Sequence, residues 1–207
     1  MQNYHKHTSF SNVLVTDCTA SYEEYVNRAI ELGQNVISSV EHGYQGNYYI
    51  PYELVQKHND SLYKKLEQGE ITEEEYKKKK LKFIFGAEAY WVKDRLLENP
   101  KIDKKTGKEI PGETVKDRTN CHIILLAKNE EGRRDINEIL SIASIDGFYG
   151  QPRIDIDLLL RIKPENVVVT TACLKYWVYE DIEEITEKLH NHFGDNFFLE
   201  IQYHNTS

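Results

Sequence analysis

Apolar residues fall in short runs that alternate with stretches of helical period. Val36 to Val40 is a run rich in β-branched residues, which predicts a buried strand. Four further runs predict strands in the same way: Phe83 to Val92, Ile123 to Ala127, Val167 to Thr171 and Phe197 to Ile201. Between them, Glu130 to Ile145 and Asp181 to Phe193 have the spacing of amphipathic helices. Alternating strands and helices predict an α/β fold with a parallel sheet or barrel.

Two segments carry helix-start signals, and a third predicts a hairpin. Ser21-Tyr-Glu-Glu24 and Thr72-Glu-Glu-Glu75 are capping boxes, and the second precedes a lysine-rich helix that we expect on the surface. Gly33 fits as the stop of the first helix. The charged segment Lys93 to Arg118 contains two prolines and two glycines, which predicts a solvent-facing excursion with a hairpin around Thr106-Gly107.

Composition narrows the class of protein. The chain has 207 residues, of which 40% are hydrophobic and 29% charged, which suits one folded domain over residues 1–207. No apolar stretch approaches the roughly 18 residues of a membrane span, and no signal pattern opens the chain, so we expect a cytoplasmic protein without membrane partners. The net charge of −8 is not that of a protein with a broad basic face for nucleic acid.

Imidazoles, carboxylates and a thiol recur at the predicted strand ends. They lie at the N-terminal edge, in the loop after it, or within two residues of a strand: His5, His7, Asp17, Glu41, His42, Glu88, His122 and Cys173. Singly, most have ordinary explanations, such as a solvated His-x-His, a turn aspartate or a buried cysteine. Glu88 and His122 do not, because each interrupts an apolar strand. Together they are the ligand types of divalent transition metals, and several carboxylates among imidazoles indicate more than one ion and metal-assisted phosphoester hydrolysis.

The order of these motifs resembles the PHP (polymerase and histidinol phosphatase) domain, and more narrowly the N-terminal PHP domains of bacterial DNA polymerase III alpha subunits. The similar stretches span nearly the whole chain: "YHKHTSFSN", "SVEHGYQG", "FIFGAEAYW", "CHIILLAKNEEGRRDINEILSIA", "DGFYGQPRIDIDLL", "TTACL" and "FFLEIQYHN". The later stretches are typical of the polymerase branch, in the form without an exonuclease insertion. The fold implied is a distorted seven-stranded β/α barrel, TIM-like, with metals at one mouth.

The resemblance also implies a ligand set and a cofactor. The family's metal ligands correspond to His5, His7, Asp17, His42, Glu88, His122 and Cys173, for two or three divalent ions of zinc, manganese or magnesium. Glu41 stands where the family usually has Asp, which would alter the support of His42 rather than the ligand set. The family's final Asp-x-His motif does not occur before Ser207, so we expect an N-terminal fragment of a longer polymerase subunit, with a barrel truncated at its C-terminus.

The activity implied is that of a metal-dependent phosphodiesterase, acting as a 3′–5′ proofreading exonuclease on DNA, with His5, His7, Glu88 and His122 as catalytic residues. The implied partners are DNA, the palm and fingers of a parent polymerase and, through that parent, a proofreading subunit and a sliding clamp. Two alternatives stay open. The domain can be a non-catalytic scaffold for the polymerase or for a separate exonuclease, or a stand-alone small-molecule phosphatase.

Two basic features have alternative interpretations. Arg153 in "QPRID" can bind a substrate phosphate by bidentate hydrogen bonds, or form a salt bridge with Asp155 or Asp157. The lysines Lys77 to Lys80 can contact DNA, or form a solvated helix face.

Overall fold

The computed structural model describes residues 4–12, 18–45, 47–119, 121–172, 176–177 and 179–202, which fall in two compact units. Unit 1 comprises residues 1–87 and unit 2 residues 88–207. One strand, β2 (Lys82–Trp91), begins in unit 1 and continues into unit 2. None of the helices in the described ranges is both long and apolar enough to cross a membrane.

The described part of unit 1 has three helices and two strands, and the first two helices pack on the strands around a small apolar core. Its elements are α1 (Tyr22–Glu31), β1 (Val36–Ser39), α2 (Tyr49–Glu67), α3 (Glu73–Lys79) and the first part of β2, with a 3₁₀ turn at Ser9–Ser11. β1 and β2 are parallel, with Val36 opposite Lys82 and Ser39 opposite Phe85. The core holds Val26, Ala29, Ile37, Val55 and Leu81.

The predicted helix starts of unit 1 are confirmed. Both Ser21/Glu24 and Thr72/Glu75 form complete capping boxes, in which each side chain bonds the other residue's backbone N–H. Helix α3 buries no residue, as its lysine-rich composition predicts. The longest helix, α2, was not predicted from the pattern, although its Pro51 sits in the first turn, where a missing N–H is tolerated.

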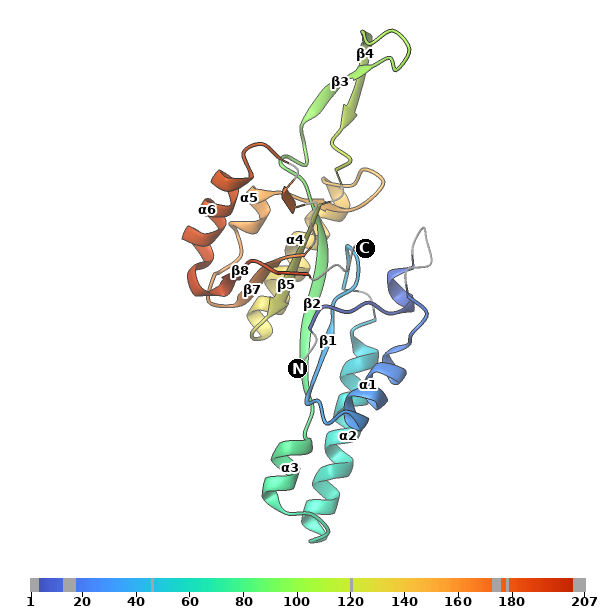
Figure 1. The fold of residues 1–207 in the computed structure, drawn as a ribbon, viewed down its shortest axis with the longest axis vertical. Helices are drawn as coiled ribbons and strands as arrows, with labels where there is room; N and C mark the ends of the chain where they lie inside the picture. The colour runs from blue at the N-terminus through green and yellow to red at the C-terminus, as the bar shows by residue number, and fades with distance from the viewer. Residues whose placement is uncertain are drawn as a thin grey trace, which may run out of the picture. The chain divides into compact units, whose positions relative to one another are not determined.

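Unit 2 contains a mixed sheet flanked by helices (Figure 1). Its strands follow the order β2, β5 (Cys121–Ala127), β7 (Val167–Thr171) and β8 (Phe197–Phe198), while β6 (Arg153–Ile154) pairs with β2. The helices are α4 (Glu130–Ile145), α5 (Ile156–Leu159) and α6 (Ile182–Phe193), with a short 3₁₀ turn, η3 (Gly194–Asn196), between α6 and β8. An α/β class is thus confirmed, whereas the closed seven-stranded barrel and the truncation stay predictions.

The sheet of unit 2 is not wholly parallel, which corrects the simplest interpretation of the pattern. β5 and β7 are antiparallel, from Ile123 opposite Thr171 to Ala127 opposite Val167. The reason lies just beyond these strands: Lys128 N–H donates to Asn166 C=O at 2.8 Å, so β7 begins where β5 ends. Because the chain re-enters the sheet at that same edge, β7 must run the opposite way.

The predicted excursion is a β-hairpin. β3 (Glu98–Ile102) and β4 (Glu109–Lys116) pair antiparallel, and all of β3 is exposed to solvent. Gly107 lies in the connecting turn at φ 67°, a conformation that favours glycine. Figure 1 shows the hairpin extending away from the rest of unit 2.

Candidate functional site

Three predicted metal ligands of unit 1 gather beside the end of β1. The ring centroids of His7 and His42 are 4.2 Å apart with the rings nearly parallel, and those of His5 and His7 are 5.3 Å apart. His42 follows β1 by three residues, and the strand fixes the backbone from which its ring projects. Within this unit, a motif at the start of the chain and the motif after β1 therefore form one imidazole cluster.

The carboxylate of Glu41 lies beneath this cluster, fully buried. Thr8 donates to it twice, from Oγ1 to Oε1 at 2.6 Å and from the backbone N–H to Oε2 at 3.3 Å. The Tyr22 hydroxyl donates to Oε1 at 2.6 Å, and the Ser11 hydroxyl donates to Oε2. Burial first, and then the bond to Glu41, raises the pKa of Tyr22 far above its ordinary value, so this hydroxyl keeps its proton.

No arginine or lysine among the described residues forms an ion pair with Glu41, so its charge is balanced by hydroxyl and amide dipoles alone. A buried carboxylate without a countercharge is costly unless its lone pairs are well satisfied. The arrangement therefore leaves unit 1 with a buried carboxyl group that has no cationic partner among the described residues, next to a group of imidazoles. That combination favours a bound cation.

Ser11 connects this carboxylate to two of the histidines. Its Oγ lies 3.0 Å from His7 Nδ1, and it accepts from the backbone N–H of His42 at 3.3 Å. A serine hydroxyl has one proton, and here that proton goes to Glu41. His7 Nδ1 must then be the donor, so the lone pair of the neutral ring sits on Nε2. A ring held in one tautomer in this way is typical of metal-binding histidines.

Unit 2 brings together the two polar residues that interrupt apolar strands. Glu88, on β2, is 2% exposed, and its Oε1 lies 3.0 Å from Nδ1 of His122 on β5. The ring of Tyr90 packs edge-on against His122, with centroids 5.2 Å apart. A carboxylate paired with an imidazole nitrogen is a usual element of a zinc or manganese site, in which the carboxylate either orients the histidine or binds the metal itself.

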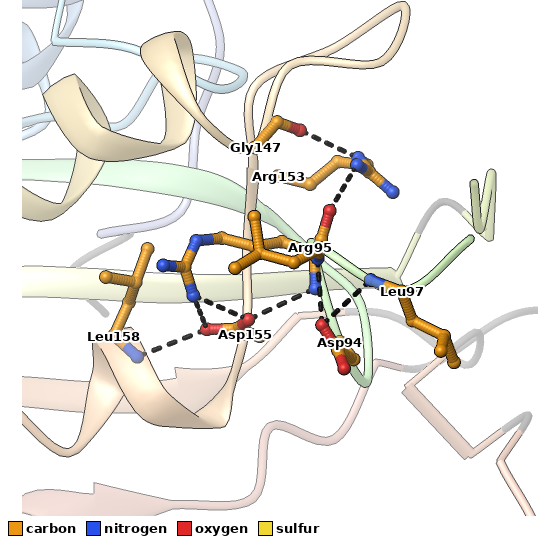
Figure 2. Close-up of polar contacts among 8 residues, drawn as sticks. Asp94, Arg95, Leu97, Gly147, Arg153, Asp155 and Leu158 are labelled. Carbon is orange, nitrogen blue, oxygen red and sulfur yellow. Dashed lines mark hydrogen bonds and ion pairs between the residues drawn. The ribbon is translucent and has the colours of Figure 1, made fainter.

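The other predicted site residues lie elsewhere. Asp17 and Cys173 lie outside the described residues. Arg153 is buried, and its guanidinium donates to three main-chain carbonyls, those of Gly147 at 2.8 Å, Asp117 at 2.7 Å and Arg95 at 2.7 Å. Figure 2 shows the bonds to Gly147 and Arg95. With these donors engaged, Arg153 ties three loops of unit 2 together, and phosphate binding by it stays a prediction.

The alternative for Arg153, a salt bridge to Asp155 or Asp157, does not form among the described residues. Asp155 is instead paired with Arg95, whose Nη1 lies 2.7 and 2.8 Å from the two carboxylate oxygens, with both side chains buried (Figure 2). Asp155 also accepts from the backbone N–H groups of Arg95 and Leu158, and so caps α5. Desolvation lowers the pKa of Arg153 from its ordinary value, and nearby acidic groups, with Asp117 foremost, oppose that effect.

Sequence reasoning missed the hydroxyl residues that hold Glu41. Thr8 and Ser11 lie in the same "HKHTSFS" stretch as the histidines, and Tyr22 is the first residue of α1. The available signal was the density of hydroxyl residues directly after His7. Its meaning depends on a carboxylate 30 or more positions away, which the local pattern does not show.

The chain matches the PHP domain family over residues 3–204. The chain belongs to the PHP domain family. Among curated proteins, this PHP domain is 30% identical to "DNA polymerase III subunit alpha" of Aquifex aeolicus, over 97% of the chain and 15% of that protein. It is 30% identical to the same subunit of Chlamydia trachomatis, over 98% of the chain and 14% of that protein.

A third relative with this name, from Borreliella burgdorferi, is 33% identical over 63% of the chain and 11% of that protein. The PHP domain therefore spans about one seventh of the length of the full-length relatives that it matches end to end. The predicted resemblance to this family, and to its polymerase branch, is confirmed.

Proposed function

We propose that this PHP domain is a metal-dependent phosphodiesterase module of a replicative DNA polymerase, and that it removes nucleotides from DNA 3′ ends. The observation that carries the proposal is the histidine cluster of unit 1 with the buried, cation-free Glu41 beneath it. Membership of the PHP family and the names of the relatives support the reaction class and the polymerase context.

The donor set fits a divalent transition metal. Imidazole nitrogen and carboxylate oxygen are the ligands that zinc and manganese take in hydrolases. We assign His5, His7 and His42 of unit 1, and Glu88 and His122 of unit 2, to two or three ions of zinc, manganese or magnesium. Asp17 and Cys173 complete the set that the family resemblance assigns. Bound metal would supply a hydroxide nucleophile at neutral pH and would stabilise the leaving oxygen.

The chain's own residues prepare this chemistry. Ser11 contacts His7 through Nδ1, which places the ring's lone pair on Nε2, and the Ser11 hydroxyl donates to Glu41. Glu88 contacts His122 through Nδ1, which fixes the orientation of that ring. Both imidazoles are thus fixed before any ligand arrives, which limits the ordering cost of binding.

A nuclease assay tests the proposal. With a 5′-labelled single strand, an intact parent subunit that contains this PHP domain should shorten the 3′ end, EDTA should stop the reaction, and Mn²⁺ or Zn²⁺ should restore it. His7→Ala should lose at least about 100-fold in rate, because the ligand and the ring oriented by Ser11 disappear together. His190→Ala removes an exposed histidine of α6 and serves as the matched control. Equal activity of His7→Ala and wild type would sink the proposal.

The alternatives differ in what they require of the metal. A scaffold would bind metal with no change in any labelled strand, or would bind none. A stand-alone phosphatase would hydrolyse a small phosphomonoester and leave the oligonucleotide intact. Partners reached through a parent polymerase, namely its palm and fingers, a proofreading subunit and a sliding clamp, belong to the same proposal. The relatives' names support only the polymerase context.

A further inference from the structure

A second polar feature lies in unit 2, where the β3–β4 hairpin meets the loop after α4. A cavity of about 500 Å³ is lined there by five hairpin or hairpin-flanking residues and one loop residue: Lys101, Thr114, Val115, Lys116, Arg118 and Tyr149. We call this cavity the hairpin pocket. None of the proposed metal ligands lines it.

The hairpin pocket is basic in an acidic chain. Its lining contains three cations and no carboxylate, whereas the whole chain has a net charge of −8. Two of these cations have acidic neighbours outside the lining. Lys101 lies 2.5 Å from Glu113, and Lys116 lies 3.9 Å from Glu98. Surface pairs of this kind are weak and screened by salt, so a multiply charged anion can compete for these lysines.

Arg118 is the cation with its donors available. Its Cζ lies 4.6 Å from the centre of the Tyr149 ring, in the range of a cation–π contact. Within the described part of the chain, its guanidinium makes no ion pair and no side-chain hydrogen bond. Arg153 also approaches this ring, at 5.5 Å, but its donors are engaged by carbonyls. Tyr149 therefore positions Arg118 while leaving its N–H fork open, the geometry that suits a phosphate.

The other charged residues of the hairpin distinguish the phosphates of a nucleic-acid strand from a free phosphate ion. Between Lys93 and Arg118 the chain has eight basic and six acidic residues, and three of the basic ones lie at or beside the hairpin turn: Lys104, Lys105 and Lys108. Cations at the turn and at the base of one exposed hairpin can follow a chain of phosphates, which a single small anion would not need. This arrangement favours a nucleic-acid strand over a free phosphate.

We propose that the hairpin pocket binds a backbone phosphate of single-stranded nucleic acid, with Arg118 as the bidentate contact and Lys101 and Lys116 as point charges. The proposal goes beyond the metal-dependent activity, because it assigns strand binding to residues that are not among the proposed metal ligands. Strand binding at this pocket needs no metal and should persist in EDTA, whereas the proposed hydrolysis should stop. Failure of one proposal is therefore distinguishable from failure of the other.

Fluorescence anisotropy of a labelled single-stranded oligonucleotide, measured in EDTA at several salt concentrations, tests the proposal. Lys101→Ala/Lys116→Ala/Arg118→Ala should weaken binding at least tenfold, and should flatten the slope of log K against log salt by about 2. The matched control, Lys57→Ala/Lys64→Ala/Lys65→Ala, removes the same charge from exposed positions of helix α2 and should change affinity less than threefold.

Arg118→Lys keeps the charge but loses the fork, and should weaken binding about fivefold with little risk to the fold. Inorganic phosphate should compete with the oligonucleotide only at concentrations far above that of the strand. Three results would overturn the proposal. The first is an equal loss of affinity in the two triple variants, and the second is wild-type affinity in both Arg118→Lys and the hairpin triple variant. The third is complete displacement of the oligonucleotide by inorganic phosphate at equimolar concentration.

Discussion

Two buried carboxylates, Glu41 in unit 1 and Asp155 in unit 2, are satisfied in opposite ways. Asp155 has a countercharge, since Arg95 contacts both of its oxygens at 2.7 and 2.8 Å. Glu41 has four hydrogen-bond donors and no cation partner among the described residues. The side chains are similar in chemistry and burial, so the difference lies in what surrounds them.

The presence or absence of a countercharge distinguishes Asp155, a structural site, from Glu41, a site suited to a ligand. At Asp155 the negative charge is already neutralised and the remaining lone pairs bond the backbone and cap α5, so nothing is left for a ligand. At Glu41 no described cation pairs with the carboxyl group, and Ser11 links that group to His7 by hydrogen bonds. A buried charge that the protein does not neutralise is best explained by a cation that binds beside it.

The largest loss of stability is expected when the buried ion pair between Arg95 and Asp155 is broken. Asp155→Asn should lower the free energy of unfolding by about 3–5 kcal/mol, because Arg95 stays buried without its partner. Denaturant unfolding measures the change. The double variant Arg95→Met/Asp155→Leu should recover part of the loss, since it removes both charges together. A loss no greater than that of Glu31→Gln, which breaks an exposed pair with Arg28, would contradict the structural assignment of Asp155.

Glu41→Gln should lower the free energy of unfolding by less than Asp155→Asn does, but it should also weaken metal binding. The amide places two donors where four donors already converge, so about 3 kcal/mol of stability should be lost. Metal affinity should fall about 10- to 100-fold, because the charge and the Ser11 link both change. Glu41→Asp keeps the charge and restores the residue usual in the family, and it should retain affinity within a few-fold of wild type. Calorimetric titration compares the variants.

Lys6 provides a pH-dependent test of the charges in unit 1. Burial lowers the pKa of Lys6 from 10.5 to about 8, and its amine lies over the Tyr25 ring. Between pH 8 and 10.5 the unfolded chain binds the proton that the folded chain has released, so stability should rise with pH in this window. The expected gain is about 3 kcal/mol, and Lys6→Met should remove it. A flat profile for wild type would mean that Lys6 is more solvated than its position indicates.

Ser11→Ala is the mildest test of the link between Glu41 and His7. It removes one of four donors to the carboxylate and should cost about 1 kcal/mol. The sharper readout is the tautomer of His7, which ¹⁵N chemical shifts report. Wild type should show the form protonated at Nδ1, and the variant should show a mixture. If wild type is already mixed, the proton of Ser11 does not fix the ring.

Much of the fold followed from local signals. Both capping boxes, the hairpin with Gly107 at its turn, and the helix Glu130–Ile145 were predicted with their correct positions, because each depends on neighbouring residues. Helix α2 was missed because it lacks a side-chain cap and its apolar spacing is weak. The antiparallel β5–β7 pair was missed because it depends on where a distant connection re-enters the sheet.

In the candidate site, too, the features that depend on local sequence were predicted and those that depend on tertiary contacts were not. The sequence indicated that Glu88 and His122 each need a polar partner, since each interrupts an apolar strand, and the structure pairs them with one another. The clustering of His5, His7 and His42 was expected from motif order and family resemblance together. The bonds that hold Glu41, and the engagement of Arg153 by three carbonyls, depend on tertiary contacts that neither spacing nor propensity contains.

The central claim is that the uncompensated Glu41 and its histidines serve a metal site, and metal binding by the 207-residue chain tests it most directly. Titration with Zn²⁺ and Mn²⁺, with bound metal quantified after dialysis, should show tight binding by wild type and by His190→Ala. His7→Ala should lose most of the affinity, and Glu41→Gln should bind about 10- to 100-fold more weakly. If His7→Ala and Glu41→Gln both bind metal as wild type does, the account of this site is wrong.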